Sequence, residues 1–163
     1  MKESIKWGNE DVNVYYNFIQ QHNSTGYTLC PVMSQEGDND EFSTFDLIQL
    51  KKSNENKYEL KNQFVELKGM RNLKFNDYPT VIVDLKKIQE LQNYGLTNKM
   101  EVYIAFIWYL DNKITIHQLD LSKDYEISCE IFSNIKIQSA GKIKKGTKKM
   151  VHLPLYNSNT YDI

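Results

Sequence analysis

The chain lacks the residues and runs that define several large protein classes. Its 163 residues include two cysteines, Cys30 and Cys129, and no CxxC spacing, so no disulfide framework is expected. The longest apolar run, Val102 to Leu110, has about half the length that a membrane-spanning helix needs. The first residues lack the apolar core of a signal peptide. We therefore expect an intracellular, cytoplasmic protein that makes no contact with a membrane.

Signatures of organic cofactors and of zinc are also missing. The chain has no P-loop, GxGxxG or GxSxG motif, and it has none of the HExxH or Cys/His spacings that bind zinc. We therefore expect neither an organic cofactor nor zinc. His117 belongs to an alternating segment in which the polar residues face away from the core, so we expect it at the surface.

Positive charge is not in excess. The formal net charge is −1, and Arg71 is the only arginine among the 20 basic residues. No overall positive field therefore points to a nucleic-acid partner. Such a partner is not excluded, because a small enzyme can confine its basic residues to one groove.

The residues that are present favour a folded α/β protein. With 40% hydrophobic and 12% aromatic residues the chain can form a core, and its length favours a single domain over residues 1–163. Helical periodicity predicts helices from Glu10 to Gln21, with Asn9 as the N-cap, and from Leu85 to about Tyr94, followed by Gly95. Strands are predicted over residues 27–33, 45–51, 58–67, 80–83, 101–110, 114–119, 125–132 and 150–155. This order predicts an α/β (α+β) fold, with a mixed central β-sheet flanked by helices.

Two carboxylates and a lysine fall at one end of a predicted hairpin. If its turn centres on Asn56, the numbers of facing residues sum to 112, and Asp46 lies across from Glu66. Because side chains alternate along a strand, Lys68 then shares the face of Glu66, while Val65 and Leu67 point to the other side. A turn displaced by one residue would break this arrangement.

Such a set suits the hydrolysis of a phosphodiester. Mg²⁺ binds to a few carboxylates and keeps several waters, and it activates water and neutralises charge on phosphate oxygens. A nearby lysine can orient the attacking water and stabilise the transition state. A second ExK tripeptide, Glu59 to Lys61, lies near the turn, and an isolated ExK is usually a solvated face. We prefer Glu66 and Lys68 because an apolar pair, Phe64 and Val65, leads into them.

The residues around this hairpin resemble a known nuclease family. Thr44 to Ile48, followed by Phe64 to Arg71, is similar to the D…ExK signature of the PD-(D/E)XK superfamily, and in particular to its small phage-type members. Tyr78, the segment Val81 to Lys87, and a late basic strand from Lys148 to Pro154 fit the same pattern. The proline of the family name is replaced by Phe45.

The resemblance implies a restriction-endonuclease-like fold and a specific site. Mg²⁺ or Mn²⁺ would be held by Asp46, Glu66 and the backbone carbonyl of Leu67, and Lys68 would serve the attacking water. The family often adds a glutamate from the first helix, for which Glu10 is the candidate. The alternative is that Glu10 is simply favoured by the dipole at a helix N-terminus.

Several basic residues are candidates for contact with nucleic acid. They are Arg71, Lys74, Lys86, Lys87, Lys144, Lys145 and Lys148. The lysine-rich segment around Gly141 and Gly146 suits a loop that contacts phosphates, but a solvated loop explains it equally well.

We therefore expect a small phage- or mobile-element-type nuclease, an endonuclease that cuts DNA with Mg²⁺ or Mn²⁺ and works in the host cytoplasm if phage-encoded. One alternative is a non-catalytic protein of the same fold that binds nucleic acid or serves in phage virion assembly. Another is an unrelated α+β interaction protein. The sequence leaves open whether the substrate is single-stranded, duplex or branched DNA, or RNA. It also leaves open a homodimer, which duplex cutters often form.

Overall fold

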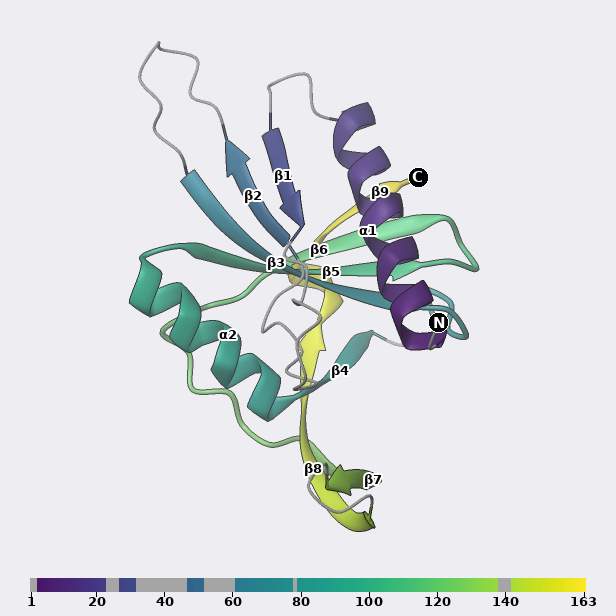
Figure 1. The fold of residues 1–163 in the computed structure, drawn as a ribbon, viewed down its shortest axis with the longest axis vertical. Coiled ribbons are helices and arrows are strands. Elements are labelled where there is room, and N and C mark those ends of the chain that lie inside the picture. Colours follow the sequence, from purple (N-terminus) through teal and green to yellow (C-terminus); the bar gives the residue numbers. More distant parts are fainter. Residues whose placement is uncertain (1–2, 23–26, 32–46, 52–60, 78, 138–141) are drawn as a thin grey trace.

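The computed structural model describes residues 3–22, 27–31, 47–51, 61–77, 79–137 and 142–163 (Figure 1). The chain begins with helix α1 and reaches its second helix, α2, after four strands. The elements are α1 (Glu3–His22), β1 (Tyr27–Pro31), β2 (Leu47–Lys51), β3 (Lys61–Met70), β4 (Thr80–Asp84), α2 (Leu85–Asn98), β5 (Glu101–Trp108), β6 (Lys113–Gln118), β7 (Cys129–Ile137), β8 (Lys142–Pro154), the short 3₁₀ helix η1 (Leu155–Asn157) and β9 (Asn159–Asp162). Neither α-helix, within the described ranges, is long and apolar enough to cross a membrane.

The strands form two sheets. The larger has six strands in the order β1-β2-β3-β5-β6-β9, and the smaller has three in the order β4-β8-β7. In the larger sheet β3 and β5 are parallel, and the other neighbouring strands are antiparallel. The β7–β8 ribbon extends away from the rest of the molecule (Figure 1). The mixed α/β fold with flanking helices, predicted from the pattern and from the resemblance to PD-(D/E)XK nucleases, is confirmed.

The two helices cover opposite faces of the larger sheet. On one face, residues of α1 such as Tyr15 and Phe18 pack against Val65 and Leu67 of β3. On the other face, Ile88 and Leu91 of α2 pack in a separate cluster with residues of β3, β5, β4 and β8. The central strand β5 is covered on both sides, as predicted, and this burial explains its nearly continuous apolar sequence.

The predicted hairpin register is confirmed where the structure describes it. Leu47 pairs with Val65 and Lys51 with Lys61, so each pair of numbers sums to 112. Asp46, which precedes Leu47, lies outside the described residues, as does the predicted turn around Asn56. The pairing of Asp46 with Glu66 therefore stays a prediction.

Several sequence-based expectations about elements are wrong. Helix α1 begins at Glu3, so Asn9 lies inside the helix and does not cap it. The lysine-rich segment is not a loop: from Lys142 onward it belongs to β8, where Gly146 pairs with Ser133 of β7. Strand β9 was not expected, because its sequence is polar and its residues stay exposed at the edge of the sheet.

Gly95 does not end its helix. Helix α2 continues to Asn98, and Lys99 takes the left-handed conformation at the C-cap with a φ of 53°. A Cβ at Gly95 would lie 2.7 Å from Cγ2 of Val102 and 2.9 Å from Cδ1 of Leu121. The glycine is therefore required by the close approach of α2 to β5.

Replacing Gly95 by alanine is expected to lower the free energy of unfolding by about 1–2 kcal/mol, because the fully buried, branched Val102 cannot move aside. At an exposed helical position the same change stabilises by about 1 kcal/mol. Urea denaturation followed by circular dichroism measures the difference. Asn93→Ala, at an exposed position of α2, is the control and is expected to stabilise. A Gly95→Ala variant as stable as the original chain would contradict the steric requirement.

Candidate active site

Glu66 is a buried acid in the middle of the larger sheet. It lies on β3, is only 3% exposed, and pairs with Ile104 of the parallel neighbour β5. A carboxylate buried to this degree is costly unless cations or hydrogen bonds compensate it. Here Nζ of Lys68 lies 2.6 Å from Oε1, and Nζ of Lys87 lies 3.1 Å from Oε2.

The predicted division of β3 between its two faces is confirmed. Val65 and Leu67 belong to the cluster under α1, whereas Phe64 belongs to the cluster on the α2 side. Glu66 and Lys68 alternate with the first pair and touch each other, so they share the α2 side. Phe64 also contacts Tyr94 of α2 edge-on, with ring centroids 6.3 Å apart. Helix α2 therefore runs along β3 in the opposite direction and brings its first turn to Glu66.

One oxygen of Glu66 is available for a further ligand. Oε2 is buried and accepts no hydrogen bond from the described residues, and its ion pair with Nζ of Lys87 is 3.1 Å long. A buried carboxylate oxygen in this state fits a hard cation such as Mg²⁺. In the described part of the chain, no three acidic, histidine or cysteine side chains gather as a metal site would require. Asp46, the predicted second ligand, is not among those residues, and the metal role of the Leu67 carbonyl stays a prediction.

His117 lies in the same row of the sheet as Glu66. Ile104 pairs with Glu66 on one side and with His117 on the other, so the fully buried Ile104 separates them. The expectation that His117 is a surface residue is wrong: it is 6% exposed, and its Nδ1 lies 2.9 Å from Oγ of Ser158. Ser158 lies just before β9, the strand that was not expected from the sequence. The alternating pattern of β6 alone therefore could not predict that His117 is buried.

The burial of His117 predicts a pH dependence of stability. Burial, and to a smaller extent the charge of Lys123, lowers the pKa of His117 below its ordinary value of 6.5. The unfolded chain therefore binds this proton more readily than the folded chain, and stability falls as the pH drops below about 6.5. We expect His117→Asn to flatten this part of the pH profile, measured by urea denaturation between pH 5 and 8. His152→Asn, which removes an exposed histidine, is the control; an unchanged slope in His117→Asn would contradict the assignment.

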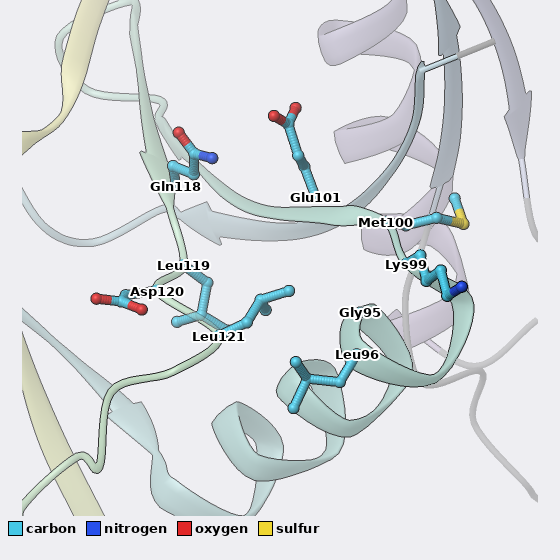
Figure 2. A pocket seen from close by; sticks show the side chains of 9 residues that line it. All are labelled: Gly95, Leu96, Lys99, Met100, Glu101, Gln118, Leu119, Asp120 and Leu121. Carbon is cyan, nitrogen blue, oxygen red and sulfur yellow. The ribbon is translucent and has the colours of Figure 1, made fainter. Parts of the chain in front are cut away.

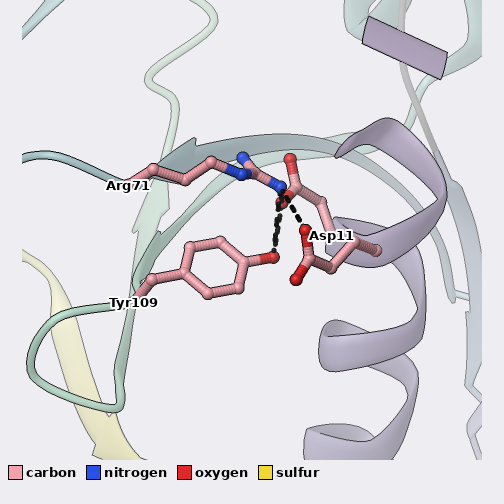
Figure 3. A network of polar contacts seen from close by, with 4 residues as sticks. Asp11, Arg71 and Tyr109 are labelled. Carbon is pink, nitrogen blue, oxygen red and sulfur yellow. Dashed lines mark hydrogen bonds and ion pairs between the residues drawn. The ribbon is translucent and has the colours of Figure 1, made fainter. Parts of the chain in front are cut away.

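Arg71 lies just past β3, in a polar network on the α1 side of the sheet (Figure 3). Its Nη2 lies 2.7 Å from Oδ1 of Asp11 and 3.1 Å from Oε2 of Glu10, both in α1. The hydroxyl of Tyr109 donates to the same Asp11 oxygen at 2.6 Å, and the guanidinium stands 4.6 Å from the centre of the Tyr109 ring. Burial and the hydrogen bond to Asp11 raise the pKa of Tyr109 well above its usual value, so the phenol remains a donor.

Gly69 makes this network possible. A Cβ at Gly69 would meet Nη1 of Arg71 and the carboxylate of Asp11, the latter at 2.6 Å. The network ties the first half of α1 to the ends of β3 and β5. The role of Asp11 was not predicted, because its partner Arg71 lies 60 positions further along the chain. The predicted roles of Glu10 in metal binding and of Arg71 in DNA binding stay predictions, and the structure shows these two residues bound to each other.

Removing Arg71 is expected to destabilise the fold. Arg71→Met leaves the largely buried carboxylate of Asp11 without its cation, and we expect a loss of about 2 kcal/mol, reduced from the fully buried case because Arg71 is partly exposed. Thermal or urea denaturation measures this loss. Lys74→Met removes the same charge from an exposed residue three positions later and is expected to change stability little. Equal effects of the two substitutions would rule out a supporting role for the network.

The other predicted phosphate-binding residues lie on three elements. Lys74 is exposed in the turn after β3, where its backbone N–H donates to Asp77. Lys86 is in the first turn of α2, with its side chain 84% exposed. Lys148 of β8 lies 3.8 Å from Asp84, the N-cap residue of α2. Two further predicted residues, Lys144 and Lys145, also belong to β8.

An open depression of about 760 Å³ lies elsewhere, between the end of α2 and the beginning of β5 (Figure 2). Leu96 and Leu121 supply much of its apolar surface, and Glu101 and Asp120 are its acids. Glu101 accepts hydrogen bonds from Gln63 and Tyr103, and Asp120 accepts from Ser122. Its acids are thus already paired, and none of the predicted catalytic residues lines it.

Comparisons with known proteins found similarity among solved structures, but none among family models or curated proteins. No family model matches the chain, and no curated protein matches it. Among solved structures, it is similar to Hjc, a Holliday junction resolvase from Archaeoglobus fulgidus, with 10% sequence identity and a TM-score of 0.45. The similarity covers 66% of this chain and 76% of that chain. Similarity at this level assigns no activity, and the proposal below rests on the chain's own residues.

Proposed function

We propose that this chain is a metal-dependent nuclease that hydrolyses DNA phosphodiester bonds at a D…ExK site formed by Asp46, Glu66 and Lys68. The observation that carries the proposal is the buried Glu66, which has Lys68 at 2.6 Å and a second oxygen that accepts no hydrogen bond from the described residues. A strand interior rarely retains such a charge for stability alone, because replacing a buried ion pair by apolar residues is often neutral or stabilising.

The residues of the site have different roles in the proposed reaction. Glu66, together with Asp46, the residue before Leu47 in the sequence, would hold Mg²⁺ or Mn²⁺ through carboxylate oxygens. When bound, the metal supplies a water of lowered pKa and neutralises charge on the phosphate. The side chain of Lys68 is 39% exposed, and its ammonium group lies next to the carboxylate. From there it is placed to orient the attacking water and to stabilise the negative charge that develops on the phosphate.

Exposed lysines around Glu66 would bind the DNA backbone. Lys86 lies in the first turn of α2, and Lys148 lies on β8 beside the N-cap of that helix, so both border the face of Glu66. Lysine contacts to phosphate position a nucleic acid without reading its sequence, and they weaken as salt rises. The overall charge of −1 does not oppose this, because these positive charges are gathered locally.

Cleavage assays test the proposal. Single-stranded, duplex and branched DNA are incubated with the protein and Mn²⁺, and products are resolved on denaturing gels. We expect cleavage by the original chain, a loss of at least about 100-fold in Glu66→Gln and Lys68→Ala, and a similar loss in Asp46→Asn.

The second ExK tripeptide provides matched controls. Glu59→Gln and Lys61→Ala make equivalent changes near the hairpin turn and are expected to keep full activity. Cleavage that survives both Glu66→Gln and Lys68→Ala would eliminate this site. A chain that binds DNA but never cleaves it would instead favour the non-catalytic alternative.

A further inference from the structure

Glu66 has more cationic partners than one carboxylate requires. Two ammonium groups face it: Lys68 on Oε1 at 2.6 Å, and Lys87 on Oε2 at 3.1 Å. Lys68 comes from the same strand and belongs to the D…ExK pattern. Lys87 comes from α2 and reaches across to the oxygen that the proposed function assigns to the metal.

The position of Lys87 is unfavourable for the helix that carries it. Lys86 and Lys87 both lie in the first turn of α2, which contains no acidic residue. The positive end of the helix dipole disfavours cations there. The N-cap Asp84 precedes the two lysines, and Glu90, one turn later, lies 3.9 Å from Nζ of Lys86. The two lysines differ in their surroundings. The side chain of Lys86 is 84% exposed, whereas that of Lys87 is 21% exposed and directed at Glu66.

A metal ion on Oε2 of Glu66 would be repelled by the ammonium group of Lys87 in its present position. Mg²⁺ binds a carboxylate oxygen at about 2.1 Å, so an ion on Oε2 would lie within roughly 5 Å of Nζ if the lysine stayed where it is. A divalent and a monovalent cation at that separation repel each other even when solvent screens them well. The lysine side chain, already partly exposed, has a path to solvent.

We propose that Lys87 is a positioning residue that holds Glu66 in the metal-free protein and is displaced when the metal binds. The inference rests on the proposed function, since it requires a metal on Glu66. Lys87 stabilises the empty site by neutralising a buried carboxylate, and it therefore weakens metal binding by competition. A purely structural lysine would have the opposite effect, because its loss would disorganise the ligand and weaken binding.

Metal affinity of the whole chain tests this. Mn²⁺ binding is measured by isothermal titration calorimetry at constant ionic strength for the original chain, Lys87→Met and Lys87→Arg. We expect Lys87→Met to bind Mn²⁺ about tenfold more tightly than the original chain. Lys87→Arg, which keeps the charge, is expected to remain within about twofold. In EDTA, Lys87→Met should melt at a lower temperature, and Mn²⁺ should raise its Tm by more than it raises that of the original chain.

Lys86→Met is the matched control, because it makes the same change one residue away in the same helical turn. It is expected to leave Mn²⁺ affinity within about twofold. Lys87→Gln serves as a second variant if Lys87→Met does not fold without metal, since its amide retains a donor near Oε2.

The outcomes separate the two proposals. The metal site stands if the original chain binds Mn²⁺ and Glu66→Gln abolishes that binding. If Lys87→Met and Lys87→Gln then bind Mn²⁺ no more tightly than the original chain, the proposed role of Lys87 is overturned. Tighter Mn²⁺ binding by Lys86→Met as well would also overturn the role of Lys87, because the loss of any nearby positive charge would then explain the effect. An absence of Mn²⁺ binding in the original chain and in the Lys87 variants overturns both.

Discussion

The parallel pairing of β3 with β5 is the constraint on which the rest of the structure depends. Parallel neighbours cannot be joined by a tight turn, so the chain between Met70 and Glu101 must cross over one face of the sheet. That crossover contains β4 and α2. It covers the face of Glu66 with the apolar side of an amphipathic helix and, because α2 runs against the direction of β3, places the first turn of the helix at the acid. Lys87 therefore reaches Glu66 and Lys68 through the topology of the crossover, because it is distant from both in the sequence.

The two faces of the larger sheet carry their charges differently. On the α1 side, Arg71 neutralises Asp11, and Arg71 and the hydroxyl of Tyr109 both donate to Oδ1 of Asp11. On the α2 side, Glu66 keeps one oxygen outside any hydrogen bond to a described residue. A fully satisfied network adds rigidity, whereas an incompletely satisfied one is expected where a ligand completes it. We infer that the α1 side supports the sheet and the α2 side performs the chemistry.

The sequence predicted most elements of the fold, and its failures have physical causes. Alternation and the turn signal were sufficient for the β2–β3 register, because a shift by one residue would have moved Val65 and Leu67 out of the core. The lysine-rich segment was assigned to a loop because its polar residues show no alternation, yet pairing with β7 along nine positions makes it a strand. Burial of His117 depends on Ser158, a tertiary contact that no local pattern contains.

For the candidate site, the same reasoning placed Glu66 and Lys68 together, but it proposed Lys87 for contact with nucleic acid and did not predict its ion pair with Glu66. Glu66 and Lys68 are two positions apart, so the period of a strand is enough to place them on one face. Lys87 is 21 positions from Glu66, and its placement required knowledge of how α2 crosses the sheet. One local signal was nevertheless present: two lysines and no acid in the first turn of a helix oppose the preference set by its dipole. A local rule broken in this way is a reason to look for a distant carboxylate, because a sequence tolerates such a conflict where function or a tertiary contact compensates it.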